Sequence, residues 1–333
     1  MLEALSRFPE SCGEGIDAAE ALPFDALRGR EFKAVVVAGV GGSAIGGHLL
    51  HDWLIESCPL PIYVSRGYRL SRFVDDETLV FTVSYSGNTE ETLAAFDEAL
   101  GRQCPVIALT SGGELRKLSI KKKIPLISLP GGMQPRAALP NQFFSMSTVM
   151  SRLALASDSW GEVGEALKVL GALRDELVLE KPTDENPAKR LALELRGLVP
   201  FVYGPRLFEA VAYRIRTQLN ENAKVPAGSG SFPEAFHNAV MGREGPEGIR
   251  NRVCALLLRD PGETPTMRRK IDAFRGLLEG RLGRVLELEA RGRGRLARMM
   301  SALYVGDYAS TYLGLLYGLD PSSTDSIAAL KRA

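Results

Sequence analysis

Residues 78–92 read TLVFTVSYSGNTEET, and this stretch decides the fold that we expect for the chain. Its first six residues are apolar or β-branched, which predicts a buried β-strand. Hydroxyl side chains and one glycine follow, and a pair of glutamates then begins a helical pattern. In open α/β sheets, ligands bind where a strand ends and the next helix begins. The stretch therefore predicts a parallel sheet with a polar loop at its carboxyl edge.

Strand patterns and helix patterns alternate on both sides of this stretch. Helical patterns run from Ser43 to about Cys58 and from Thr89 to Leu100. Continuous apolar strands separated by helices predict a parallel sheet that is covered on both faces. The expected strands are residues 34–38, 61–64, 79–83, 106–109 and 125–129.

The same alternation begins again after a charged, proline-containing stretch at residues 180–187. A helical pattern follows Gly204 to about Asn222, and a longer one covers residues 296–319. We therefore expect an α/β protein with two doubly wound parallel-sheet domains of flavodoxin-like architecture, at residues 1–155 and 156–333, joined by helices between about Ser145 and Leu179. The expected strands of the second domain are residues 199–203, 253–258 and 285–288.

Composition and charge exclude several classes of protein. Lys and Arg total 41 against 40 Asp and Glu, so a net charge of +1 favours neither nucleic acid nor an anionic membrane. The apolar runs are strand-sized, and the first residues lack the pattern of a signal peptide. The cysteines are scattered without a CxxC pair, which favours buried, reduced thiols and a cytoplasmic protein. They are Cys12, Cys58, Cys104 and Cys254.

A second glycine-rich loop, GVGGSAIGG at residues 39–47, follows the first expected strand. It lacks the GxGxxG spacing of dinucleotide-binding proteins and the Lys-Ser/Thr pair of a nucleotide P-loop, so a nucleotide-dependent oxidoreductase is disfavoured. Backbone N–H groups at helix starts, together with several hydroxyls, suit a phosphate monoester bound without a metal. The alternative is that Ser86, Asn88 or Thr89 only caps the next helix. His48 and His51 lie one helical turn apart without a third ligand, so we expect no metal site.

The two loops together resemble the sugar isomerase (SIS) domain, an α/β module that binds phosphosugars. The chain as a whole resembles the bifunctional phosphoglucose/phosphomannose isomerases. The further segments that carry this resemblance are GGMQPR (131–136), QLNENAK (218–224), PE and HN (233–234 and 237–238), GDYAS (306–310) and the run from Asp320 to Lys331.

The resemblance implies an isomerase that interconverts glucose 6-phosphate, mannose 6-phosphate or both with fructose 6-phosphate, without a cofactor. Glu221 is then the base that moves a proton between C2 and C1, and Arg136 stabilises the enediolate. His237 and Lys331 assist opening of the sugar ring, and Thr324 lies beside C2. The phosphate is anchored by Gly41, Gly42, Ser43, Ser84, Ser86 and Thr89.

The resemblance also implies a homodimer in which the partner subunit supplies the histidine of each site. GSGS at residues 228–231 precedes His237, and its composition predicts a flexible tether. The family usually carries a glutamate after the His-Asn pair, whereas Ala239 stands here. Two alternatives remain open. Glu221 could form an ordinary helical ion pair with Lys224, and the chain could be a non-catalytic SIS-type sensor of a phosphosugar.

Overall fold

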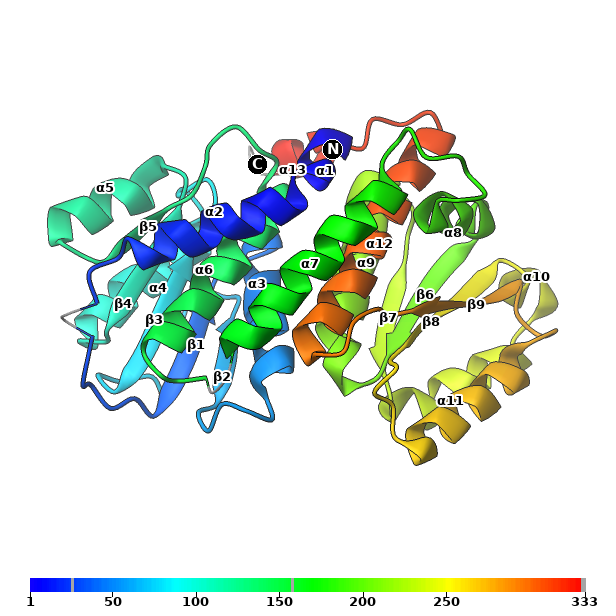
Figure 1. Ribbon diagram of the computed structural model, residues 1–333, viewed down its shortest axis with the longest axis horizontal. Helices are drawn as coiled ribbons and strands as arrows, with labels where there is room; N and C mark the ends of the chain where they lie inside the picture. Colours follow the sequence, from blue (N-terminus) through cyan, green and yellow to red (C-terminus); the bar gives the residue numbers. More distant parts are fainter. Residues whose placement is uncertain (25–26, 157–158, 331–333) are drawn as a thin grey trace. The chain divides into compact units, whose positions relative to one another are not determined.

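The computed structural model describes residues 1–24, 27–156 and 159–330. The chain divides into two compact units, one of Arg7–Gly161 and the other of Met1–Ser6 with Glu162–Ala333 (Figure 1). Both contain a parallel sheet, so the expected two-domain α/β fold class is confirmed. Among the described residues, no helix is long and apolar enough to cross a membrane.

The sheet of the first unit has the strand order β2-β1-β3-β4-β5, and every neighbouring pair is parallel. Residues of β1 and β3 are buried throughout, as the continuous apolar pattern predicts for a sheet covered on both faces. The five strands are β1 (Ala34–Ala38), β2 (Ile62–Ser65), β3 (Thr78–Val83), β4 (Val106–Thr110) and β5 (Leu126–Ser128).

Helices cover both faces of this sheet (Figure 1). α4 (Glu90–Gly101) and α5 (Gly113–Lys122) share an apolar cluster with strand residues such as Val36 and Val80. The remaining helices are α2 (Phe8–Glu20), α3 (Gly42–Leu54), the 3₁₀ helix η1 (Pro135–Ala138) and α6 (Leu139–Arg152).

α2 and α6 approach closely, because a Cβ on Gly15 would lie 2.5 Å from Asn141 O. α3 ends four residues earlier than the pattern predicts. Cys58 precedes a proline, which disfavours helical backbone for that residue, and the last helical residue is Leu54.

The sheet of the second unit has the order β7-β6-β8-β9 and is also parallel. α12 (Arg295–Leu316) packs beside α9 (Glu209–Asn222), and a buried ion pair joins the two, with Arg214 Nη2 2.9 Å from Asp307 Oδ2. The strands are β6 (Val199–Gly204), β7 (Gly228–Ser231), β8 (Val253–Arg259) and β9 (Arg284–Glu289). The other helices are α1 (Leu2–Ser6), α7 (Ser159–Leu177), α8 (Pro187–Leu195), η2 (Arg206–Phe208), η3 (Glu234–Phe236), η4 (Ala239–Glu244), α10 (Glu247–Arg250), α11 (Pro265–Leu278) and α13 (Asp325–Leu330).

The expectation of a flexible tether at residues 228–231 is wrong, because these residues form strand β7 beside β6. A Cβ on Gly228 would lie 2.4 Å from the Phe201 ring, and a Cβ on Gly230 would lie 3.0 Å from the Tyr203 ring. Glycine therefore leaves room for aromatic rings of the neighbouring strand. Composition alone does not reveal this packing, so the segment resembles a linker.

Candidate functional site

Two loops meet at the carboxyl edge of the first sheet. β1 and β3 are neighbours with Ala38 opposite Thr82, so the loops that follow them leave the sheet side by side. The backbone N–H of Tyr85 donates to Ser43 Oγ at 3.4 Å and links the two loops directly. The parallel register thus brings the glycine-rich loop and the hydroxyl loop to one place.

Hydrogen bonds within the hydroxyl loop hold its side chains in order. Ser84 Oγ donates to Thr89 Oγ1 at 2.9 Å and accepts from the Gly87 N–H at 3.1 Å. Ser86 Oγ, on an exposed residue, accepts from the Asn88 N–H at 3.3 Å. Gly87 has a φ of +71°, and a Cβ there would lie only 1.8 Å from Gly112 O. Only glycine can occupy this turn without displacing the next loop.

The starts of α3 and α4 have no side-chain cap. The residues at the N-cap positions are Gly41 and Thr89, and neither makes a side-chain hydrogen bond to its helix. Asn186 caps α8 and Thr264 caps α11, whereas α2, α6 and α9 start without a side-chain cap, as α3 and α4 do. The alternative that a hydroxyl of the loop only caps α4 is therefore wrong. Uncapped N–H groups at the positive ends of two helices are suited to an anion.

Arg136 lies against the start of α3. It is 2% exposed and sits in η1. A Cβ on Gly42 would be 3.2 Å from Arg136 Cα, so the backbones of η1 and α3 are in close contact. The first unit therefore brings together seven of the predicted site residues. They are Gly41, Gly42, Ser43, Ser84, Ser86, Thr89 and Arg136.

In the second unit, Lys224 links the end of α9, which carries Glu221, to the segment that precedes Thr324. Glu221 is partly buried in the last turn of α9, and Thr324 directly precedes α13. Lys224, with a left-handed φ of +56°, donates from Nζ to Glu221 O at 2.5 Å. The same ammonium donates to Asp320 O and Ser323 O, each at 3.0 Å. Lys331 lies outside the described residues.

His237 follows η3 and is exposed. Its backbone N–H donates to Glu234 O at 2.9 Å, and the Glu234 carboxylate accepts from Asn238 Nδ2 at 3.0 Å. Ala239 packs against an apolar cluster that includes Phe232 and Phe274. An apolar residue suits this position, where a carboxylate would lose hydration.

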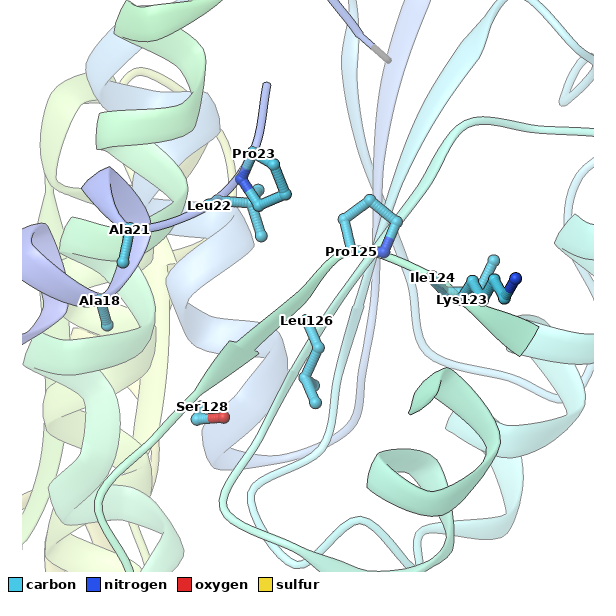
Figure 2. A pocket seen from close by; sticks show the side chains of 9 residues that line it. All are labelled: Ala18, Ala21, Leu22, Pro23, Lys123, Ile124, Pro125, Leu126 and Ser128. Carbon is cyan, nitrogen blue, oxygen red and sulfur yellow. The ribbon is translucent and has the colours of Figure 1, made fainter. Parts of the chain in front are cut away.

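A groove of about 710 Å³ lies elsewhere in the first unit, between the end of α2 and edge strand β5 (Figure 2). Most of its lining is apolar, including Leu22, Pro125 and Leu126, and it contains none of the predicted site residues. Its chemistry does not suit a phosphate, so the candidate site remains at the hydroxyl loop.

Comparisons with known proteins identify the family of this chain. A family model described as the bacterial phospho-glucose isomerase C-terminal SIS domain matches residues 184–333. The chain is 36% identical to a bifunctional phosphoglucose/phosphomannose isomerase of Caldicellulosiruptor bescii, over 99% of this chain and 98% of that protein. The chain belongs to the bifunctional phosphoglucose/phosphomannose isomerase family.

One more member of the phosphoglucose/phosphomannose isomerase family and one solved structure are also similar to the chain. The Aquifex aeolicus protein of the same name is 34% identical over 90% of each chain. The solved structure of a hypothetical protein from Thermus thermophilus has a TM-score of 0.78 and 18% identity, and the match covers 99% of this chain and 88% of that one. The second likeness shows the fold alone.

Sequence reasoning missed Gln142 and named Lys224 only as a possible ion-pair partner of Glu221. Gln142 of α6 is buried and donates to Ser43, and Lys224 makes the three carbonyl contacts described above. The sequence feature that marks Gln142 is an amide side chain within α6, a helix that is buried on all faces. The pattern alone does not reveal the partner of that amide, because 99 residues separate it from Ser43.

Proposed function

We propose that this protein interconverts glucose 6-phosphate, mannose 6-phosphate or both with fructose 6-phosphate through an enediolate. The observation that carries the proposal is the cluster of hydroxyls in the two linked loops, at the starts of α3 and α4. Membership in the family supplies the reaction class.

In this proposal the first unit anchors the phosphate. Ser43, Ser86 and Thr89 donate hydroxyl hydrogen bonds, and N–H groups near Gly41 and Gly42 add to them. Ser84 contributes by donating to Thr89 Oγ1, which holds the Thr89 hydroxyl in place. Binding energy from the phosphate then helps to position the distant reacting carbons. The buried guanidinium of Arg136 stabilises negative charge on the enediolate oxygens.

The second unit supplies the proton chemistry. After ring opening with His237 and Lys331, the Glu221 carboxylate removes the proton from C2 of the aldose. The C1–C2 enediolate forms, the hydroxyl proton of O2 passes to O1, and Glu221 returns a proton to C1 to give the ketose. Glucose and mannose 6-phosphates differ only at C2, and that stereocentre disappears in the enediolate. A small space near Thr324 would let one base serve both epimers.

We further propose that the protein acts in the cytoplasm as a homodimer, with the partner subunit supplying the histidine of each site. The exposure of His237 is compatible with a role across a subunit interface. This arrangement makes activity depend on assembly, which the dilution and mixing experiments in the Discussion test.

The test is a coupled assay that starts from fructose 6-phosphate and scores glucose 6-phosphate and mannose 6-phosphate separately. Glu221→Gln should lower kcat at least about 100-fold, because an amide cannot accept the C2 proton. Its affinity for glucose 6-phosphate, measured by calorimetry, should persist. Absence of both products with the wild-type protein would refute the proposed activity, and retained turnover by Glu221→Gln would place the base elsewhere.

A further inference from the structure

α6 carries a buried amide that core packing does not require. Gln142 is 0% exposed, and its Nε2 donates to Ser43 Oγ at 3.4 Å. Its Oε1 has no hydrogen-bond partner within the described ranges of the chain. A buried amide with an unsatisfied oxygen stabilises a core less than an apolar side chain of similar volume. Core stability alone therefore does not explain Gln142.

Ser43 receives two hydrogen bonds and donates to no acceptor among the described residues. Its second donor is the backbone N–H of Tyr85, also at 3.4 Å. A hydroxyl has two lone pairs and one hydrogen, so these donors leave Ser43 with only its hydrogen to offer. Both distances are at the long end for hydrogen bonds, so each bond alone would orient the hydroxyl weakly and the pair restricts it.

We propose that Gln142 is a positioning residue that keeps the Ser43 hydroxyl oriented as a donor to the substrate phosphate. The inference rests on the proposed function, in which Ser43 binds that phosphate. α6 directly follows η1, whose Arg136 backbone contacts the start of α3. The continuous segment of η1 and α6 thus contacts the glycine-rich loop through Arg136 and orients the Ser43 hydroxyl through Gln142.

Gln142→Met tests the proposal, because it keeps the length of the side chain and removes the hydrogen bond. We expect KM for fructose 6-phosphate and Kd for glucose 6-phosphate to rise about fivefold, while kcat changes little. In a Ser43→Ala background, Gln142→Met should cause no further rise. Gln142→Glu, which replaces the donor with a second acceptor near the phosphate, should weaken binding more than Gln142→Met.

Asn141→Leu is the matched control. Asn141 is equally buried on the same helix, but its Nδ2 donates to Glu14 Oε2 at 3.2 Å rather than to Ser43. This control should leave KM and Kd unchanged, so it separates a general change in the packing of α6 from a specific effect on Ser43.

An equal loss of affinity with and without the Ser43 hydroxyl would overturn the proposal, because Gln142 would then act through packing. Unchanged Kd in both Gln142 variants would also overturn it. Calorimetry of glucose 6-phosphate binding distinguishes a failure of the Gln142 proposal from a failure of the proposed isomerase function. A protein that binds glucose 6-phosphate without isomerising it still tests Gln142, and a protein that does not bind it refutes both.

Discussion

At the scale of single residues, hydrogen bonds within the hydroxyl loop determine which of its hydroxyls can still contact a ligand. Ser84 is occupied within the loop, since it donates to Thr89 and accepts from Gly87. Ser86 Oγ accepts from Asn88, and its hydrogen remains to be donated. Glu90 follows at the helix start, with its carboxylate 3.5 Å from the Tyr68 hydroxyl on the side of α4. Because the hydroxyl oxygens of the loop already accept hydrogen bonds, the groups left to contact an anion are donors.

The combined change Ser86→Ala and Thr89→Val should raise KM for fructose 6-phosphate at least about tenfold, because hydrogen bonds to a charged group contribute about 1.5–3 kcal/mol each. Steady-state kinetics measure KM and kcat, and circular dichroism checks the fold. Kinetics equal to those of the wild type would show that these hydroxyls do not contact the phosphate.

At the scale of elements, helix ends and strand edges are satisfied by residues far away in the sequence. The start of α12 is capped from α7, because the Glu165 carboxylate accepts from the N–H groups of Arg293 and Gly294 at 2.6 and 2.9 Å. Glu162 accepts from Leu296 N at 2.8 Å in the same way. Residues 291–294 of the basic run thus form the bend that directly precedes α12.

Glu165→Gln should destabilise the protein at pH 7 by about 1 kcal/mol, since it weakens charge-assisted hydrogen bonds at a helix start. Hydrogen bonds from Arg293 N–H and then Gly294 N–H lower the pKa of the Glu165 carboxyl. A lowered folded-state pKa gives stability above the ordinary value of 4.5, and that stability is lost as the pH falls through the folded pKa. The Tm difference between variant and wild type should therefore shrink below about pH 4. A difference that is constant with pH would contradict a role for the charge.

Strand β7 gives a second prediction at this scale. Gly228→Val should lower stability by about 1–3 kcal/mol, because its side chain would overlap the Phe201 ring, although valine by itself favours strands. Phe201→Ala should lower stability less in the Gly228→Val background than in the wild type. Thermal unfolding of the four proteins measures this coupling, and strictly additive effects would contradict the packing argument.

At the scale of the whole molecule, two similar sheets carry different chemistry. In the second unit, the loop after β8 contains Asp260 and Glu263, which pair with Arg298 and Arg259. Thr264 Oγ1 caps the following helix by accepting from Met267 N at 3.2 Å. Carboxylates and a filled cap oppose an anion at this edge. The phosphate site is therefore expected in the first unit alone.

The proposed shared sites predict complementation between chains. Mixing inactive His237→Ala and Glu221→Gln chains should recover about a quarter of wild-type activity per total sites, because half of the dimers are mixed and each has one intact site. Dilution of the wild type should lower specific activity as dimers separate. Native mass spectrometry verifies subunit exchange, and a mixture that exchanges but stays inactive would place His237 in the site of its own chain.

Much of this architecture was predictable from the sequence. The apolar runs predicted all five strands of the first sheet and three strands of the second. The signal is strongest for β1, β3, β4 and β8, because strands buried on both faces contain apolar residues at nearly every position. The ordered motifs indicated the family. The resemblance to that family, and not local composition, supplied the proposed roles of Glu221, Arg136, His237, Lys331 and Thr324.

Tertiary structure alone decided the rest, because those features depend on partners distant in sequence. GSGS is a strand because it pairs with β6, and its glycines leave room for the rings of Phe201 and Tyr203. The hydroxyl loop leaves helix starts uncapped, although its residues are good caps, because Ser84 and Thr89 bond to each other. Gln142 and Lys224 acquire roles only when folding brings Ser43 and the carbonyls of residues 320 and 323 beside them.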